Sequence, residues 1–411
     1  MLPDGWKRVR LGDIARISSG GTPDRSEPRY WNGDIPWVTT GEIQFNTITD
    51  TAEKITAEGL KHSSAKLFPP GTLLMAMYGQ GKTRGQVAKL GIEAATNQAC
   101  AAMRLSDDCD LDYIYQCLAS HYEAIRELGN AGAQQNLSAA LVKGITLPLP
   151  PQQEQVRIGA LASCWDEAIA STGQLLANSR RQKQDLMQGL LTGHRTFGVD
   201  SAQWSHVEFD QVFERVTRKN TAGDQNVLTI SGQHGLISQR EYFSRVVASD
   251  DLSGYTHLST GDFAYNKSSS NGYPMGAIKP LVAYDSGVVS SLYICFRIRP
   301  GVEADEDFFS HYFDAGMLND EITGIAQEGA RSHGLLNVSV KEFFKLKMRV
   351  PPLEDQRRIA QVLNTAQEEI RNIEEQLERL KTEKRALMNE LLTGKRLVRT
   401  PAKSEEAREP A

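Results

Sequence analysis

The sequence is poor in the features that mark secreted, membrane-spanning and metal-binding proteins. Its 411 residues include five cysteines, an odd number with no CxxC pair, which predicts reduced thiols in the cytoplasm. No apolar run is long enough to span a membrane, and no basic-then-apolar start indicates a signal peptide. No two of the eight histidines lie three to five residues apart, so the spacing supports no zinc site. We therefore expect a cytoplasmic protein that has no membrane partner.

An excess of positive charge is also missing. The formal net charge is -5 and the pI is about 6.0, whereas a protein that binds nucleic acid by itself is usually basic. Hydrophobic residues make up 40% and charged residues 24% of the chain, which are ordinary values for a soluble protein of two or three domains. Any nucleic-acid binding must therefore depend on local clusters of Lys and Arg side chains.

What the chain does contain is a long internal repeat. Residues 150–195 and 351–396 align without a gap at an offset of 201 and share sixteen identical residues. Each copy opens on a Pro-Pro pair and closes on the same Leu-Leu-Thr-Gly. A match of this length indicates a duplicated architecture.

Each copy of the repeat predicts one long helix. Mostly apolar residues recur at alternating steps of three and four from Ile359 to Leu391, and positions from Ile158 to Leu190 keep the same register. This spacing is typical of the seam of a coiled coil. The proline pair marks the start of each helix and the glycine marks its end. A helix of about 35 to 40 residues is about 55 to 60 Å long.

The charges predict how the two helices meet. Both begin acidic and end basic, so antiparallel pairing makes the two gradients complementary. The alternative is that each helix only satisfies its own dipole, but a seam of this length requires a partner. Leu175 and Leu363 lie beside the seam. We expect them to form an exposed hydrophobic strip for partner proteins, with a thicker intramolecular core as the alternative.

The two segments outside the helices look like diverged copies of one domain. Both contain short strand-like runs broken by Gly, Pro, Asn and Asp, and each has a predicted helix near its end, at 111–128 and 305–327. Trp6 and Leu11 match Trp204 and Phe209 near the two starts. The sequence therefore predicts an α+β fold with an internal pseudo-twofold repeat: a first domain at 1–149, a first helix at 150–195, a second domain at 196–350, a second helix at 351–397, and a disordered tail at 398–411.

One glycine-rich segment imitates a phosphate-binding loop. Residues 76–83 end in Gly-Lys-Thr after an apolar run, but the P-loop motif requires Gly where Ala76 stands. The residues that follow, Arg84 and Gly85, begin a helix poorly. A nucleotide site is therefore disfavoured. We interpret the segment as a loop whose backbone approaches a polyanion, with contacts to phosphates or base edges from Gln80, Lys82, Thr83 and Arg84.

These features together resemble the specificity subunit of type I restriction-modification enzymes. The first half carries Gly20-Gly-Thr-Pro23, the run from Trp31 to Trp37, the run from Tyr78 to Gly85, Asn97-Gln-Ala99, and the run from Pro150 to Gln155. The second half resembles another branch of the same domain family, through the runs 228–235, 265–268, 276–279, 329–337 and 351–356. The resemblance covers residues 1 to 397.

The resemblance implies a noncatalytic subunit that reads a bipartite, asymmetric target in double-stranded DNA. Each sheet-rich domain would be a target recognition domain for one half of the target, and the two helices would act as spacer and docking surface. Two modification subunits would bring S-adenosylmethionine and methylate adenine, so this chain itself needs no cofactor. Restriction and translocase subunits would then join to cut unmodified DNA.

The second domain has its own candidate DNA contacts in glycine- and serine-rich loops: Lys267, Asn271, Arg331 and His333. For the charged residues among them, the alternative is that they are ordinary solvent-exposed loop charges. For the whole chain, the competing hypothesis is a coiled-coil scaffold that binds proteins and does not read DNA. An enzyme hypothesis rests only on the imperfect phosphate loop.

Overall fold

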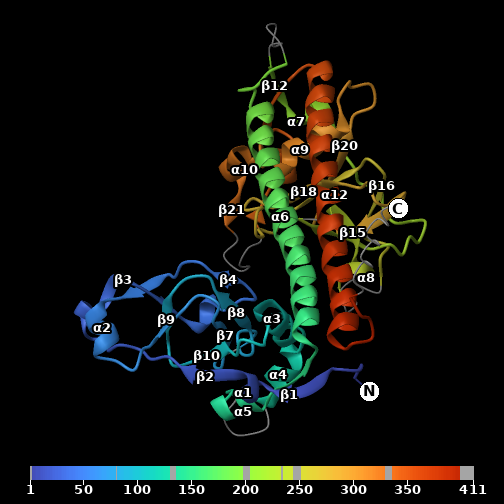
Figure 1. The fold of residues 1–411 in the computed structure, drawn as a ribbon. Coiled ribbons are helices and arrows are strands. Elements are labelled where there is room, and N and C mark those ends of the chain that lie inside the picture. Colours follow the sequence, from blue (N-terminus) through green and yellow to red (C-terminus); the bar gives the residue numbers. More distant parts are fainter. Residues whose placement is uncertain are drawn as a thin grey trace, which may run out of the picture. The chain divides into compact units, whose positions relative to one another are not determined.

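The computed structural model divides into two compact units (Figure 1). One unit comprises Met1–Gly173 with Glu375–Ala411, and the other comprises Gln174–Glu374. Each unit combines a sheet-rich part with half of each long helix, which confirms the predicted α+β fold. The structure describes residues 2–79, 81–129, 136–197, 204–232, 235–243, 251–328 and 336–398. The predicted disordered tail lies outside these residues, apart from its first position.

The two long helices are α6, Gln152–Leu191, and α12, Leu353–Leu392, each of 40 residues. The helices begin directly after the proline pairs. Gly193 and Gly394 follow their ends with φ angles of 76° and 71°, a conformation that favours glycine. Every predicted seam position is buried or half-buried in both helices. The predicted seam and helix lengths are therefore confirmed.

The pairing of α6 and α12 is antiparallel. In the first unit, Lys384 Nζ of α12 lies 2.6 Å from Asp166 Oδ1 of α6. In the second unit, Lys183 Nζ of α6 donates to Gln367 Oε1 of α12 at 2.6 Å. At the 201-residue offset of the repeat, Lys384 corresponds to Lys183 and Gln367 corresponds to Asp166. The two contacts are therefore equivalent, and the predicted antiparallel coiled coil is confirmed.

The first unit contains a five-stranded sheet, a four-stranded sheet and a strand pair. The five-stranded order is β2-β10-β7-β8-β4, the four-stranded order is β5-β3-β9-β6, and β1 pairs with β11. Strand bounds are β1 Lys7–Arg10, β2 Ala15–Ser19, β3 Trp31–Val38, β4 Thr47–Ile48, β5 Glu53–Ile55, β6 Leu67–Phe68, β7 Leu73–Ala76, β8 Val87–Leu90, β9 Ala94–Thr96, β10 Cys100–Leu105 and β11 Thr146–Leu149.

The second unit repeats the main sheet of the first. Its four-stranded order β13-β20-β17-β18 corresponds to β2-β10-β7-β8, and its pair β12-β23 corresponds to β1-β11. The remaining strands form the pairs β14-β15, β16-β19 and β21-β22. Strand bounds are β12 Ser205–Glu208, β13 Phe213–Arg215, β14 Leu228–Ser231, β15 Gly235–Ser238, β16 Thr256–Ser259, β17 Phe263–Asn266, β18 Ala277–Pro280, β19 Ser286–Val289, β20 Ile294–Ile298, β21 Gln327–Glu328, β22 Leu336–Asn337 and β23 Lys347–Val350.

The shorter helices also recur in the same order in the two units. The helix predicted near the end of each domain is in fact two helices, because the backbone leaves the helical path at His121 in one copy and at Gly316, with φ of 70°, in the other. Helix bounds are α1 Leu11–Ile14, α2 Ala57–Lys61, α3 Leu111–Ser120, α4 Tyr122–Leu128, α5 Ala139–Gly144, α7 Phe209–Val212, α8 Gln239–Tyr242, α9 Glu306–Asp314, α10 Asn319–Ile325 and α11 Val340–Phe343.

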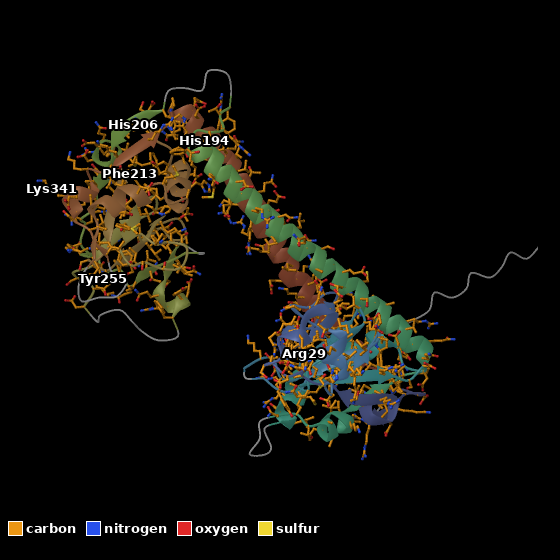
Figure 2. The ribbon with its side chains drawn as sticks, turned by 90° about the vertical axis from the view of Figure 1, so that its left-hand side faces the viewer. Arg29, His194, His206, Phe213, Tyr255 and Lys341 are labelled. Carbon is orange, nitrogen blue, oxygen red and sulfur yellow. The ribbon has the colours of Figure 1, made fainter. Side chains whose placement is uncertain are left out.

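Each long helix also packs into the core of a sheet unit. Leu391 and Leu392 of α12 belong to the core of the first unit, and Leu190 of α6 belongs to the core of the second. The second core is rich in aromatic rings, among them the fully buried Phe213 that Figure 2 labels. Leu363 lies in this core with no exposed surface. The expectation that Leu363 forms part of an exposed strip is therefore wrong.

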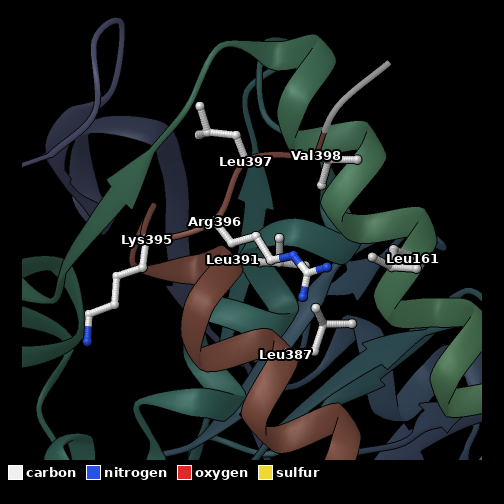
Figure 3. Close-up of a pocket in the computed structure, with 7 residues that line it drawn as sticks. All are labelled: Leu161, Leu387, Leu391, Lys395, Arg396, Leu397 and Val398. Carbon is white, nitrogen blue, oxygen red and sulfur yellow. The ribbon is translucent and has the colours of Figure 1, made fainter. Parts of the chain in front are cut away.

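Other apolar residues on the long helices are exposed to solvent. Leu175 of α6 is 50% exposed, as predicted. The first unit also has an apolar hollow of about 750 Å³ where the last turns of α12 approach α6 (Figure 3). It is lined by Leu161, Leu387, Leu391, Lys395, Arg396, Leu397 and Val398.

A buried glutamine anchors the first turn of each long helix. Gln155 Oε1 accepts the backbone N–H of Asp110, and its Nε2 donates to the carbonyl of Pro150, both at 2.9 Å. The second copy repeats both bonds at 2.9 Å, through Gln356, Asp305 and Pro351. Asp110 and Asp305 in turn cap α3 and α9. One side chain therefore fixes the helix start to the neighbouring domain helix.

We predict that Gln356→Ala lowers the free energy of unfolding by about 2 to 4 kcal/mol, because it leaves a buried N–H and a buried carbonyl without their partner. Equilibrium denaturation in urea measures the change. Gln361→Ala, at an exposed position on the same helix, is the control and should cost less than about 0.5 kcal/mol. Equal effects of the two substitutions would contradict the anchoring role.

The stability of the second unit should also depend on pH through His311 of α9. Burial lowers the pKa of His311 below its ordinary value of 6.5, although the contact of Nε2 with Asn364 Oδ1 at 2.7 Å opposes the change. Because the pKa of His311 is lower in the folded state than in the unfolded state, His311 does not reduce the free energy of unfolding above pH 6.5. That free energy falls as the pH drops from 6.5 toward the pKa of the folded state. Gln116 occupies the equivalent position in the first unit. The urea midpoint of the natural chain should be lower at pH 5 than at pH 7, and His311→Gln should make this difference smaller. An unchanged difference would exclude His311 as its source.

Candidate nucleic-acid interface

Two hairpin loops occupy the same place in the two copies of the main sheet. In the first unit the chain passes from β7 through residues 77–86 into the antiparallel strand β8. In the second it passes from β17 through residues 267–276 into the antiparallel strand β18. We call these the first and second hairpin loops. The first carries Lys82, Thr83 and Arg84, and the second carries Lys267 and Asn271.

Glycines set the path of the first hairpin loop. Gly79, Gly81 and Gly85 have φ angles of 144°, 72° and 86°, which side chains other than glycine rarely adopt. A Cβ on Gly79 would also lie 2.8 Å from the Cβ of Thr83. The loop closes through a bond from the Gly85 N–H to the Ala76 carbonyl at 2.8 Å. The glycines therefore serve a tight turn between two strands.

This geometry excludes a nucleotide-binding P-loop. A P-loop connects a strand to a helix, whose N-terminus faces the phosphates. Here the Gly-Lys-Thr segment leads into β8, and β8 pairs with β7 from Leu73 to Met75. The sequence-based rejection of a nucleotide site is thus supported by the strand-loop-strand arrangement.

Two side chains of helix α4 hydrogen-bond to the backbone of the first hairpin loop. The hydroxyl of Tyr122 donates to the carbonyl of Lys82, and Arg126 Nη2 donates to the carbonyl of Gly81 at 2.7 Å. The guanidinium of Arg126 lies 5.4 Å from the centre of the Tyr122 ring, and Phe45 packs edge-on against the same ring. Sequence reasoning missed Tyr122 and Arg126. Their spacing of four on a predicted helix was the available signal, since it places both on one face.

The predicted contact residues of the first hairpin loop differ in exposure. Lys82 is exposed and Thr83 is half-buried. Arg84 is only 7% exposed, and its side chain packs on Gly129, where a Cβ would approach it to 3.4 Å. In this conformation Lys82 is available to a ligand, whereas Arg84 is placed to hold the loop. A role for these residues in DNA contact stays a prediction.

The second hairpin loop is held by a different set of contacts. Asn271 is exposed at its tip, beside a bond from the Ser270 N–H to the Tyr273 carbonyl at 3.1 Å. Lys279 Nζ on β18 contacts Tyr273 Oη at 2.9 Å and Asp314 Oδ1 at 2.5 Å. Burial opposes the charge of Lys279, but the attraction of Asp314 leaves its pKa raised. The ammonium is therefore a fixed cation at the base of this loop.

Lys267 sits at the start of the same loop and is half-buried. Its carbonyl accepts the N–H of Leu336 at 3.0 Å, which joins the loop to β22. The other predicted site residues, Gln80, Arg331 and His333, lie outside the described residues.

The motifs that carry the resemblance serve mainly to build the frame. A Cβ on Gly20 would lie 1.9 Å from the carbonyl oxygen of Thr96, so only glycine permits this approach. The indole of Trp37, which is 2% exposed, donates to the carbonyl of Gly21 at 3.0 Å. Asn97 Oδ1 accepts the N–H of Ala99 at 3.0 Å. These residues support the sheet and expose little of their own surface.

Potential metal ligands and thiols are scattered among the described residues. Among them, no three His, Cys, Asp or Glu side chains gather as metal ligands would. Burial raises the pKa of the Cys100, Cys117 and Cys295 thiols to about 12, and all five cysteines are free. Within the same part of the chain, no helix combines the length and apolarity needed to cross a membrane.

Two copies of a mixed sheet unit, each with a hairpin loop and half of each long helix, define a duplicated architecture. Residues 3–178 match the family described as the Type I restriction modification DNA specificity domain. This match covers somewhat less than half of the chain, and it confirms the resemblance to type I restriction-modification specificity subunits found in the sequence.

Known relatives agree with this assignment. The chain is 24% identical over 213 residues to the type I restriction enzyme MjaIX specificity subunit of Methanocaldococcus jannaschii, a match that covers 51% of this chain and 47% of that protein. The matched region thus spans about half the length of that relative. The MjaVIII specificity subunit of the same organism is 21% identical over 423 residues, covering 96% of this chain and 93% of its own length.

A solved structure shares the fold. The type I restriction-modification S subunit from M. genitalium superimposes with a TM-score of 0.59 at 14% sequence identity. The superposition covers 95% of this chain and 98% of that one.

We predict different effects for the two neighbouring cations of the first hairpin loop. Lys82→Ala should leave the urea midpoint unchanged. If Lys82 grips phosphate, the variant should weaken binding to all duplexes alike and lower the salt slope by about one; if it reads a base, it should lose about 1 to 3 kcal/mol at one position. Arg84→Ala should lower stability by about 1 to 3 kcal/mol, because it removes a buried charged side chain from its contacts.

Fluorescence anisotropy with labelled duplexes at several salt concentrations measures the DNA affinities. The exposed residue Lys66, outside the loop, provides the control variant Lys66→Ala. Unchanged binding by both loop variants would remove the first hairpin loop from the interface.

Proposed function

We propose that this chain reads DNA for a type I restriction-modification complex and that its target is bipartite and asymmetric. The observation that carries the proposal is the recurrence of one hairpin loop at the same position in two copies of the sheet. One loop in each copy supplies one reader for each half of a split target. The two loops carry different residues, as an asymmetric target requires.

The net charge of -5 requires that DNA binding be local. Exposed hydrogen-bond donors stand on both hairpin loops, with Lys82 on the first and Asn271 on the second. Base edges are recognised by such amide and ammonium donors, and phosphates by cations. The isolated chain should therefore bind DNA weakly, with further phosphate contacts supplied by partner subunits.

The partners we propose are two modification subunits, followed by restriction and translocase subunits. The modification subunits bring S-adenosylmethionine and transfer its methyl group to adenine, while this chain has no catalytic role. Two near-equivalent long helices offer two near-equivalent docking sites. The exposed Leu175 and the apolar hollow near Leu397 support docking on the helix pair.

A coiled-coil scaffold that binds proteins without reading DNA is the alternative function. It is compatible with the helix pair and with the acidic net charge. Sequence-dependent, salt-sensitive DNA binding by the complex separates the two hypotheses, because a scaffold would show neither property.

Mapping of methylated adenines in cells that express the complete complex tests the proposal directly. We expect methylation at a split target, one half of which responds to each hairpin loop. Lys82→Ala should alter the preference or efficiency at one half only, and Asn271→Ala at the other half only. Methylation that does not depend on this chain, or variants that affect both halves alike, would contradict the proposal.

The helix pair should also set the spacing between the two halves of the target. Four residues inserted after Ala170 shift the apolar seam out of phase, so we expect loss of assembly or an altered spacing. The control inserts seven residues at the same place and seven near Leu380 in the facing stretch of α12. This preserves the seam and lengthens the pair by about 10 Å, or about three base pairs. A normal target spacing with both insertions would refute the spacer role.

A further inference from the structure

Two arginines lie directly opposite each other on adjacent strands of the main sheet of the first unit. Arg16 on β2 and Arg104 on β10 are direct partners in the antiparallel register, and both are exposed. Within the described residues neither makes an ion pair. Like charges directly opposite each other destabilise a strand pair, so this arrangement calls for an anion from outside the chain.

The second unit provides an internal comparison. Strands β13 and β20 correspond to β2 and β10, and their register pairs Glu214 with Arg297 at the equivalent position. Arg297 Nη2 lies 2.6 Å from Glu214 Oε1, and Arg297 Nε donates to the same oxygen at 2.7 Å. The same site therefore holds a closed ion pair in one copy and two unpaired cations in the other.

The contrast extends to neighbouring positions. Arg10 directly precedes α1, and Lys143 on α5 lies against Gly12 of α1, where a Cβ would come within 3.0 Å of the Lys143 Cβ. Figure 1 shows β1, α1, β2 and α5 gathered in this part of the first unit. We call the set of Arg10, Arg16, Arg104 and Lys143 the basic face.

A shallow hollow lies on the basic face. Its volume is about 490 Å³, and its lining includes Arg16, Arg104 and one carboxylate, Asp13. In the second copy, Glu208 replaces Arg10 and forms an ion pair with Lys345 at 3.0 Å, and Phe344 replaces Lys143. The equivalent face is thus neutralised within the second unit.

The position of the basic face favours an acidic protein over DNA as its occupant. Cys100 pairs with Ala76 at the end of the sheet that bears the first hairpin loop, whereas Arg104 lies four residues further along β10, about 13 Å away. The basic face therefore lies at the other end of β10 from the loop that we propose as the DNA contact.

We propose that the basic face docks an acidic surface of a modification subunit and that the second copy has no counterpart of this contact. The inference rests on the proposed function and adds to it the charge of the partner surface and an inequality of the two docking sites. Electrostatic attraction of this kind mainly raises the association rate and is screened by salt.

The test variant is Arg16→Glu in the full chain, co-expressed with its modification subunit. The substitution places in the first copy the Glu-Arg pair that the second copy already has, so it should leave the urea midpoint unchanged or raise it. We expect binding of one of the two modification subunits to weaken on the order of tenfold, measured by light scattering and titration at about 0.1 and 0.3 M salt. Arg10→Ser should weaken the same site to a smaller degree, about threefold.

Lys66→Glu makes the same charge change at an exposed position of the same unit, away from the basic face, and should assemble like the natural chain. Affinity of the isolated Arg16→Glu chain for target and nonspecific duplexes should stay unchanged. Equal weakening for all duplexes with intact assembly would assign the face to the DNA backbone and overturn the inference. Natural assembly by both Arg16→Glu and Arg10→Ser would also overturn it, whereas failure of the natural chain to recruit any modification subunit would refute the proposed function itself.

Discussion

The structure depends on the need of α6 and α12 to bury two faces at once. One face forms the seam between the helices, where Arg180 and Glu374 lie 2.6 Å apart and Ile370 and Ile373 are buried. The other face enters the core of a sheet unit, as Leu363 does. An isolated helix of this kind has little stability in water. Both faces must be covered, so neither a long helix nor a sheet unit has a complete core of its own.

This constraint makes the first unit discontinuous in sequence. The contact between Lys384 and Asp166 joins residues 218 positions apart, and the first core includes Leu391 and Leu392 together with Trp6. Contacts between such distant residues form slowly, because loop closure comes before their stabilising energy. The first unit can therefore complete its core only after the end of the second helix is available.

The repeat and the periodicity were sufficient to predict much of the fold. The seam from Ile158 to Leu190, the helix lengths and the antiparallel pairing follow from spacing and charge, which depend on neighbours along one helix. The failures involve contacts that spacing does not encode. Leu363 resembled a surface residue, but α9 and the second core cover it. A helix predicted over 305–327 is interrupted after Asp314, where Gly316 takes a φ of 70° that ends α9, and the apolar spacing does not register this stop.

The two hairpin loops were predictable from the sequence in place, but the burial of their side chains was not. The glycine-rich segments correctly marked the two hairpin loops, because glycine is needed for their positive φ angles. Arg84 looked like an exposed contact, yet its side chain is buried against Gly129. Tyr122 and Arg126 donate hydrogen bonds to backbone carbonyl groups of the loop. Every residue has such a carbonyl group, whatever its side chain. Nothing in the loop sequence therefore points to them.

Comparison of the two copies separates support from recognition. The buried glutamines Gln155 and Gln356 make the same two hydrogen bonds in both copies, and all four bonds are 2.9 Å long. The cross-strand position of Arg16 and Glu214, by contrast, has opposite charge in the two copies. In this duplication the charge has changed at an exposed position, whereas the buried glutamine that needs a fixed partner is the same in both copies.

The burial of the thiols has a practical consequence for following assembly. Three of the five cysteines are buried with raised pKa values, and Cys109 is half-buried with its pKa raised by desolvation. Cys164 is exposed on α6, one turn from the Leu161 that lines the apolar hollow. A maleimide dye at neutral pH should therefore react first at Cys164. The natural chain thus carries its own attachment point for a reporter of events on the helix pair, without the removal of any other cysteine.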